Sequence, residues 1–376
     1  MPTTRRKTSS QPKASKHRVP ADSLTTKLLD TSITNAMIAE WLAQAAEHAK
    51  MPLQKALRRA SRKSFLWAEE AVLMVQNGES LTELPGVGPT LNRIIRGWLE
   101  NPPETSEQRP EIRSGFLSLP QAQAALAKNP AWAARVKGDL QMHTVWSDGS
   151  DSIEDMARAA AERGYEYIAI TDHSKGLKIA GGIDEQQLLN QEEEIRRVND
   201  LLETEGSQLR VLRSIELNIN PQGEGDMEES ALRRLDLVLG CFHSALRKKD
   251  DQTERYLAAL KNPTIHILGH PRGRIYNFRL GLTADWSRVF AMAAKLDKAV
   301  EIDGYPDRQD LSLDLLKLAK KEGCRISLGT DSHGASQLRF MDFSLAAALL
   351  SGIEPDRILN FMSREELLQW ASALRQ

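Results

Sequence analysis

The sequence predicts an α/β protein in which a parallel barrel of seven strands follows a small all-helical domain. Seven short apolar runs each end in polar residues, and continuous Val, Ile and Leu runs are typical of strands buried on both faces of a parallel sheet. Residues 32–99 instead repeat their apolar side chains at helical spacing. The length of 376 residues is enough for a barrel of about 250 residues together with a smaller domain. The seven runs are residues 138–144 (GDLQMHT), 167–174 (YIAITDHS), 211–218 (VLRSIELN), 237–244 (LVLGCFHS), 265–272 (IHILGHPR), 300–306 (VEIDGYP) and 326–333 (ISLGTDSH).

The composition, 41% hydrophobic and 27% charged, is that of a soluble globular protein. Only Cys241 and Cys324 are present, which argues against a disulfide framework and favours a reducing compartment. No apolar stretch approaches the roughly 18 residues of a membrane span, and no signal-peptide core follows the first residues. We therefore expect a cytoplasmic protein with no membrane partner.

Basic charge is concentrated at the start of the chain. The net charge is −1, yet residues 1–64 contain 13 Lys and Arg against 4 Asp and Glu. This imbalance suggests an anionic partner, of which nucleic acid is the usual one. We expect residues 1–30 to form a disordered basic tail, because residues 1–20 are rich in Ser, Thr, Pro, Lys and Arg without apolar periodicity. A solvated tail without a partner is the alternative for this segment.

Residues 31–100 are expected to form the helical domain. Thr34 or Asn35 can cap a first helix, a second helix follows from about residue 53, and a third ends at Asn77-Gly78, which is a plausible helix C-terminus. The exposed side of the second helix is basic and holds Lys55, Arg58, Arg59, Arg62 and Lys63.

The stretch 81–95 (LTELPGVGPTLNRII) resembles a helix-hairpin-helix, a module that binds DNA backbones. Gly86 and Gly88 permit a tight turn and leave backbone N–H groups uncovered, and these groups together with the N-terminus of the next helix favour a phosphate. Arg93 and Arg96 would add charge-assisted contacts, with Arg62 and Lys63 on the neighbouring basic helix. A glycine turn between two packed helices is the alternative reading. The segment from about residue 33 to 98 also resembles the leading helical domain of family X DNA polymerases.

Residues 101–137 are expected to form a linker that packs on the barrel. The segment contains five prolines and one Ala-rich stretch. It is too short for a polymerase palm, and no Asp-x-Asp pair follows it in a polymerase-like context. Nucleotide polymerisation is therefore not expected. The barrel domain should span residues 138–376.

The segment from Asp139 to about residue 368 resembles the polymerase-and-histidinol-phosphatase (PHP) domain, most closely that of bacterial family X DNA polymerases. The resemblance implies a distorted (β/α)7 barrel, which agrees with the seven apolar runs. The motifs that carry it are DLQMHTVWSDG (139–149), ITDHS (170–174), IELN (215–218), FHS (242–244), GHPRGR (269–274) and GTDSH (329–333).

The resemblance also implies up to three divalent metal ions, because imidazole and carboxylate ligands together suit Zn²⁺, Mn²⁺ or Fe. One site would consist of Gln141, His143, Glu216 and Asp331. A second would share Glu216 and add His243 and His270. A third would consist of Asp148, His173 and His333.

Two positions depart from the family pattern. The first motif normally reads His-x-His, whereas here Gln141 stands in the first place, and an amide oxygen is a weaker ligand than imidazole. The sixth run has Glu301 and Asp303 where relatives often carry Asn. Asp172 is expected to orient a ligand or to bind the loop backbone, and His266 is expected to be structural.

These features lead to three functional hypotheses. The first is a DNA-processing 3′–5′ nuclease, in which Arg272 and Arg274 stabilise charge on the phosphate; both arginines have a structural role as the alternative. The second is a small-molecule phosphatase of the histidinol-phosphatase type. The third is a DNA-binding protein whose weakened metal site no longer catalyses.

Overall fold

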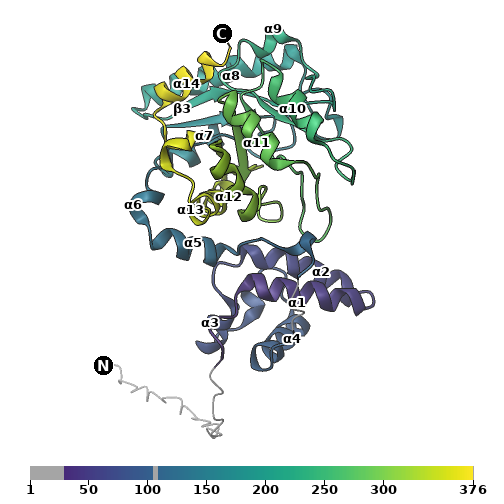
Figure 1. Ribbon diagram of the computed structural model, residues 1–376. Coiled ribbons are helices and arrows are strands. Elements are labelled where there is room, and N and C mark those ends of the chain that lie inside the picture. The colour runs from purple at the N-terminus through teal and green to yellow at the C-terminus, as the bar shows by residue number, and fades with distance from the viewer. Residues whose placement is uncertain (1–28, 105–108, 376) are drawn as a thin grey trace, which may run out of the picture.

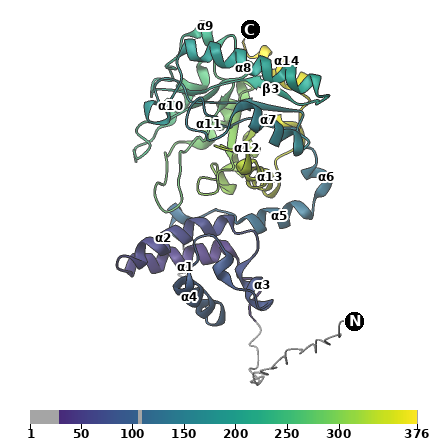
Figure 2. The same cartoon turned by 180° about the vertical axis from the view of Figure 1, so that it is seen from behind.

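The computed structural model describes residues 29–104 and 109–375, which form a helical module and an α/β barrel (Figure 1). The predicted basic tail lies outside the described residues except for its last two. Figure 2 shows from the opposite side that the module contacts one end of the barrel, with α5 (Leu119–Ala127) running between them.

The helical module contains four α-helices and two single 3₁₀ turns. The Thr34 side chain accepts a hydrogen bond from the N–H of Met37 and caps the first helix, as the sequence predicts. The third helix ends at Gln76 with Asn77 as its C-cap, and Gly78 follows with a left-handed φ of 79°, in agreement with the predicted C-terminus at Asn77-Gly78. The elements are α1 (Asn35–His48), α2 (Leu53–Lys63), η1 (Ser64–Leu66), α3 (Ala71–Gln76), η2 (Leu81–Glu83) and α4 (Pro89–Glu100). One apolar core includes Ile38, Trp41, Leu42, Leu57, Val72, Leu81 and Ile95.

Parallel strands form the barrel, and all of the expected apolar runs contribute to it. The third run is divided at Ser214-Ile215 into β3 (Arg210–Arg213) and β4 (Glu216–Asn218). β3 pairs with the preceding strand and β4 with the following one, so the strands form two sheets of orders β1-β2-β3 and β4-β5-β6-β7-β8. The remaining strands are β1 (Gly138–Asp139), β2 (Tyr167–Ile170), β5 (Leu239–Cys241), β6 (Ile267–Leu268), β7 (Ala299–Asp303) and β8 (Arg325–Gly329).

Two single parallel bridges join the sheets. One links His173 to Glu216, and the other links Met142 to Ser332. They close the ring of seven strand runs, with the third run broken, and this agrees with the distorted barrel that the sequence predicts.

Helices follow the strands around the outside of the barrel. Their starts are encoded locally: Ser152 and Asp155 form a capping box at α7, and Asp184 and Gln187 form another at α8. The helices are α6 (Pro130–Ala133), α7 (Ile153–Glu162), α8 (Glu185–Thr204), α9 (Glu229–Leu232), α10 (Thr253–Lys261), α11 (Trp286–Lys295), α12 (Leu313–Glu322), α13 (Met341–Leu350) and α14 (Arg364–Ala373). Short 3₁₀ turns lie at η3 (Glu111–Arg113), η4 (Lys178–Ala180), η5 (Ala335–Phe340), η6 (Pro355–Arg357) and η7 (Leu359–Phe361).

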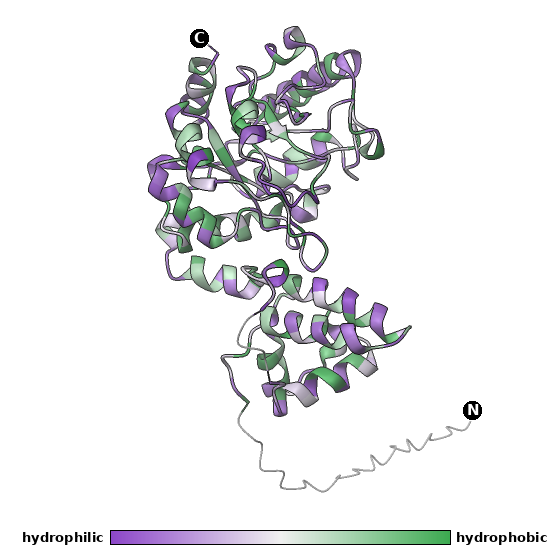
Figure 3. Ribbon diagram, turned by 45° about the vertical axis from the view of Figure 1, so that its right-hand side comes forward, coloured by the Kyte–Doolittle hydropathy of each residue, from purple (hydrophilic) through white to green (hydrophobic). Residues whose placement is uncertain are grey.

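The core of the barrel is mainly apolar, but the strands also bury the carboxyl groups of Asp139, Glu301 and Asp303. Figure 3 shows the strands mainly in the hydrophobic colour, whereas the surrounding helices alternate between apolar and polar residues. Leu367 and Trp370 of α14 pack against Leu140, Tyr167 and other interior side chains and so cover the barrel. Polar side chains lie at the carboxyl ends of the strands.

The loop between β6 and α11 fastens the helical module to the barrel (Figure 1). Tyr276 of this loop packs edge-on against Phe65 of the module and Phe116 of the linker, with ring centroids 4.8 and 5.1 Å away. Arg113 binds Glu40 of α1 at 3.0 Å and the Asn277 side chain at 3.3 Å. The module therefore has a fixed position beside this loop.

Candidate metal centre

The carboxyl ends of the strands bring the predicted ligands together. His143 follows β1, His173 follows β2, and Glu216 begins β4 after the break in the third run. His270 and Asp331, after β6 and β8, both have left-handed backbone, with φ of 22° and 51°. Positive φ is uncommon outside glycine, although Asp and His adopt it more often than most residues, and such positions cluster at functional sites.

Glu216 is the centre of the cluster and is fully buried. Its Oε1 lies 2.7 Å from Nε2 of His243 and 2.8 Å from Nε2 of His270. Its Oε2 lies 3.2 Å from Nε2 of His143 and accepts a hydrogen bond from the Gln141 amide at 3.0 Å. Both carboxylate oxygens thus face ring nitrogens, as a bridging carboxylate requires.

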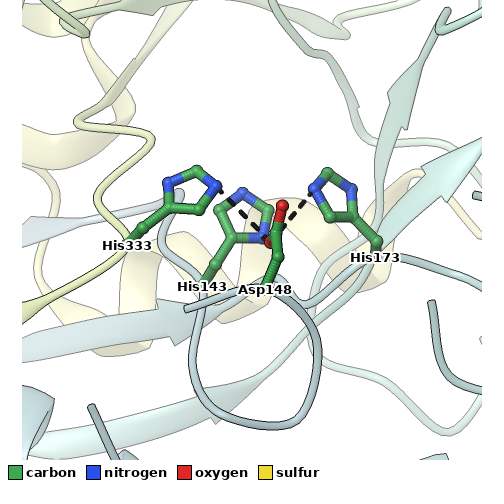
Figure 4. A group of neighbouring side chains, drawn as sticks. All are labelled: His143, Asp148, His173 and His333. Carbon is green, nitrogen blue, oxygen red and sulfur yellow. Dashed lines mark ion pairs between the residues drawn. The ribbon is translucent and has the colours of Figure 1, made fainter. Parts of the chain in front are cut away.

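Asp148 is the centre of a second part of the cluster, in which three imidazoles surround its carboxylate (Figure 4). Oδ1 of Asp148 lies 3.5 Å from Nε2 of His173, 3.4 Å from Nε2 of His333 and 4.0 Å from Nδ1 of His143. The Asp148 side chain is 35% exposed, so this part of the cluster opens to solvent.

Asp331 connects the cluster to the loop after β7. Its Oδ1 lies 3.0 Å from Nε2 of His143, and its Oδ2 accepts a hydrogen bond from Arg308. All nine predicted ligands are therefore linked through one set of contacts. Groups close enough to hold an ion are His143, Asp148, His173 and His333; His173, Glu216 and His243; Glu216, Cys241 and His270; and His143, Glu216 and Asp331.

Burial and neighbouring charges set the protonation states of the cluster. Burial lowers the pKa of His173 to about 3, so its ring is neutral at pH 7 and keeps a lone pair for a metal. Burial opposes ionisation of Glu216, but the surrounding imidazoles hold the pKa of its carboxyl well below the usual range. Asp331 is likewise buried, and Arg308 foremost holds its pKa below the usual range. For His270 the charge of Glu216 outweighs burial and raises the pKa of the ring to about 9. Neutral imidazoles and ionised carboxylates are the forms that bind metal ions, so this ring would release a proton on binding one.

Several buried polar atoms of this cluster have no hydrogen-bond partner. They include Nδ1 of His143, Nδ1 of His173 and Oε1 of Gln141, and all three residues are less than a tenth exposed. Leaving such atoms without a partner is unfavourable, and nitrogen and oxygen donors in this arrangement suit divalent cations. The residues present therefore fit a metal centre.

Two residues of the cluster are ones that the sequence interpretation missed. Arg308 lies in the loop after β7, and its contact with Asp331 depends on how that loop folds back. Cys241 on β5 belongs to the group of Glu216 and His270, and burial raises the pKa of its thiol well above the usual range. A cysteine two residues before a strand-end histidine points to the same face of the strand, which is a signal that could have identified it.

The loops behind the ligands are held by buried carboxylates. Asp172 accepts hydrogen bonds from the Thr144 N–H at 2.8 Å and from the Gln191 side chain at 2.7 Å. Its predicted role in binding the loop backbone is confirmed. His266 accepts a hydrogen bond from the Val238 N–H at 3.1 Å and is structural, as expected.

Arg272 and Arg274, predicted to act on the phosphate, are instead engaged with the linker. Arg274 donates to the Gly115 carbonyl at 2.9 Å and lies 3.8 Å above the centroid of the Phe116 ring. Arg272 pairs with Glu111 at 3.3 Å. Within the described residues, no hydrogen bond or ion pair joins either guanidinium to a residue of the metal cluster. Because both are buried and occupied, the geometry favours their alternative, structural role.

The predicted DNA-binding residues lie together on one part of the helical module. Gly86 has a left-handed φ of 88°, and Gly88 directly precedes α4. A Cβ at Gly86 would lie 3.1 Å from Cδ of Lys63, so the hairpin adjoins the end of α2. Arg62, Lys63 and Arg93 are exposed, whereas Arg96 donates to the Glu79 carbonyl and to Asn92. The first helix of the resembled motif is replaced here by the single 3₁₀ turn η2, which precedes the glycine turn.

None of the helices in the described part of the chain is both long and apolar enough to cross a membrane.

Fold and site together define a metal-dependent hydrolase of the α/β-barrel class. The chain belongs to the PHP domain family, whose model matches residues 139–330. It is accordingly a hydrolase that acts on phosphoester bonds.

Two curated relatives illustrate the range of the family. The chain is 35% identical over 234 residues to the DNA polymerase/3′-5′ exonuclease PolX of Bacillus subtilis, and this alignment covers 62% of the chain but only 40% of PolX. It is 28% identical over 232 residues to a probable phosphatase of Caldicellulosiruptor bescii, covering 59% of the chain and 90% of that protein.

Among solved structures, histidinol phosphate phosphatase from Lactococcus lactis, complexed with zinc, L-histidinol and phosphate, has a TM-score of 0.38 and 16% identity. The similarity covers 64% of this chain and 92% of that one. It is too low to support a conclusion about this protein.

Proposed function

We propose that the protein is a DNA-processing 3′–5′ nuclease that trims ends with a multinuclear metal centre. The observation that carries the proposal is the fixed position of the helical module, whose helix α2 has a basic exposed side, next to the loop that follows the ligand His270. This places a surface for polyanions next to a phosphoesterase centre. The similarity to PolX, which its name describes as an exonuclease, supports the same substrate class. The two cysteines are free and buried, which suits a reducing, cytoplasmic location.

Up to three divalent ions, Mn²⁺, Zn²⁺ or Fe, would be held by the nine predicted ligands. Gln141, His143, Glu216 and Asp331 would hold one ion, and Glu216 with His243 and His270 a second. Asp148, His173 and His333 would hold a third, with His143 close enough to contribute. When bound, such ions lower the pKa of water and neutralise charge on a phosphate.

The most exposed ligands mark the side from which a substrate approaches. The side chains of Asp148, His333 and His243 are 35%, 22% and 16% exposed, whereas Glu216 is fully buried. Arg308 lies at the edge of the cluster with its side chain 30% exposed. Since it is held by Asp331 and still reaches solvent, Arg308 would bind a phosphate oxygen and stabilise the charge that develops during transfer.

The hairpin at Gly86 and Gly88 would hold the DNA backbone without reading sequence. Its left-handed glycine and the start of α4 offer backbone N–H groups to a phosphate. Arg62, Lys63 and Arg93 would add positive charge nearby. Because Arg96 is already bound to the Glu79 carbonyl, its role in this proposal is to hold the hairpin.

A second candidate is a phosphatase of small phosphomonoesters. The alignment with the probable phosphatase of Caldicellulosiruptor bescii covers 90% of the length of that protein. The barrel domain alone therefore corresponds to nearly all of a phosphatase of this kind. In that case the helical module would serve for packing only, and the protein would have no affinity for DNA.

A Mn²⁺-dependent assay with 3′-labelled oligonucleotide and with histidinol phosphate separates these candidates. The nuclease releases nucleotides from the oligonucleotide, and chelation or His243→Ala abolishes the release. DNA affinity should fall steeply with salt. Turnover of histidinol phosphate without DNA binding would overturn the nuclease proposal in favour of the phosphatase. DNA binding without turnover under any metal would instead identify a catalytically inactive binding protein.

A further inference from the structure

The loop between β6 and α11 presents an aromatic ring to solvent. Phe278 is 53% exposed, although its own N–H donates to the Ile275 carbonyl at 3.1 Å and the two residues before it are also held. The Asn277 N–H donates to the Ile112 carbonyl at 3.1 Å, and the Tyr276 N–H donates to the Asp307 carbonyl at 2.7 Å. A single exposed apolar side chain is ordinary on a protein surface. Whether Phe278 has a binding role therefore depends on the residues around it.

A cation lies over the Phe278 ring. Cζ of Arg247 is 4.6 Å from the ring centroid, and its Nη1 donates to the Phe278 carbonyl at 3.3 Å. No carboxylate within the described residues forms an ion pair with Arg247. Lys248 and Lys249 follow it and are exposed. An aromatic ring beside unpaired positive charge is the combination that binds bases and phosphates of single-stranded nucleic acid.

A cleft of about 250 Å³ lies between this loop and the helical module, and Phe278 lines it. Arg58 and Arg62, one helical turn apart on α2, line it from the other side. Among the described residues, neither arginine forms an ion pair. Glu47 also lines the cleft, but Arg113 binds its carboxylate at 2.6 Å. The charge left for a ligand is therefore positive.

Positive groups continue from the cleft to the metal centre. Burial, and after it the charges of Arg308 and Arg247, lower the pKa of Arg279, the residue after Phe278. Arg308 in turn binds the predicted ligand Asp331. Burial raises the pKa of Asp307 against the charges of Arg308 and Arg62. Arg279 and Arg308 thus extend the basic surface of the cleft toward the cluster, with the carboxyl group of Asp307 beside them, and would attract a polyanion.

We propose that Phe278 and Arg247 form a stacking site for an unpaired base of single-stranded DNA, with Arg58 and Arg62 binding the adjoining phosphates. This inference rests on the proposed nuclease function. It assigns the path that the single DNA strand takes between the helical module and the metal centre. Stacking tolerates any base, since every base has a π-face, so the site would not select sequence. Paired and stacked bases of a duplex do not offer that face, which makes the site specific for single strands.

Equilibrium binding of fluorescent oligothymidylate to the full-length protein tests the site. The oligonucleotide carries phosphorothioate linkages, which slow its hydrolysis, and anisotropy reports its binding. Phe278→Ala should weaken binding about tenfold, within the range for loss of one stacked base, and Phe278→Trp should restore it. The matched control is Leu350→Ala, which removes an apolar side chain of similar exposure (47%) at the end of α13. Arg58→Gln should reduce the slope of log affinity against log salt by about 1.

Phe278→Ala affinity equal to that of Leu350→Ala would overturn the stacking site. The same loss of affinity for a duplex of equal length would also overturn it, because a duplex offers no free base. Failure of the nuclease proposal looks different: the unaltered protein would bind oligothymidylate through Phe278 yet release no nucleotide with any divalent ion. If instead the protein cleaves the strand and Phe278→Ala leaves its KM for the strand unchanged, only the stacking site is wrong.

Discussion

Replacing Gln141 by histidine should strengthen metal binding by at least tenfold. In the structure the Gln141 amide donates to Oε2 of Glu216 at 3.0 Å. An ion bound to that oxygen must displace this hydrogen bond, and a bond to a charged acceptor has a net value of about 1.5–3 kcal/mol. At about 1.4 kcal/mol per tenfold, removing the competition alone would raise affinity about 10- to 100-fold. The imidazole would add a stronger donor than the amide oxygen.

The Gln141 side chain lies beside Gly329 and the carboxyl group of Glu301. Gly329 opposite has no side chain, and a Cβ there would lie only 2.8 Å from Cβ of Gln141 and 3.0 Å from its Oε1. The Gln141 side chain therefore lies over bare backbone, and Gln141→His should not require a shift of a neighbouring side chain at 329.

Competition with a chromophoric chelator measures the affinity of Gln141→His for Zn²⁺ and Mn²⁺, and elemental analysis measures its stoichiometry. The matched control is Gln369→His, which adds the same imidazole to an exposed position on α14. Identical stoichiometry and affinity in the unaltered protein and Gln141→His would refute the reasoning that the amide weakens this site.

Three further predictions concern the cluster, the interface and the barrel wall. His243→Ala should abolish turnover and remove metal while the circular dichroism spectrum is unchanged, because the side chain is partly exposed; full activity would contradict its role as a ligand. Arg113→Met should lower the free energy of unfolding by about 3–5 kcal/mol in urea, because it leaves the buried carboxylate of Glu40 without its partner; Glu40→Gln in the same background should recover part of the loss, and no recovery would count against the pairing. Burial lowers the pKa of Lys298 to about 8, so the unfolded chain binds more protons above that pH and the free energy of unfolding should rise between pH 8 and about 10.4, by at most about 3 kcal/mol. Lys298→Met should remove this rise, as measured by urea unfolding at both ends of the range, and an equal rise in both proteins would show that Lys298 is not its source.

Much of the barrel could be predicted from the sequence because each strand and its ligand are adjacent in the chain. His143, His173 and His243 each follow an apolar run directly, and parallel strands of a closed sheet must bring their carboxyl ends together. The order of runs therefore determines which side chains meet. The division of the third run at Ser214-Ile215 could not be predicted in this way, because a change of pairing partner leaves the apolar pattern unaltered.

The arginines show where local sequence stops being informative. Arg272 and Arg274 follow the same strand as His270, yet their partners, Glu111 and Gly115, lie about 160 residues earlier in the chain. Arg308 reaches Asp331 through the course of an irregular loop. The direction of a long side chain on a loop is set by tertiary contacts. The roles of these arginines could therefore be assigned only from the structure.

The division of the barrel into two sheets has a consequence for folding. The sheets meet at two seams, marked by the bridges His173–Glu216 and Met142–Ser332, and both bridges lie at or beside predicted ligands. Three of the four ligand groups draw residues from both sheets. Bound ions would thus cross-link the two halves of the wall at its seams, and opening either seam would require their release. Metal loading should accordingly raise the melting temperature with the logarithm of the ion concentration above the dissociation constant. Chelation should leave a barrel whose two sheets separate first along these two seams.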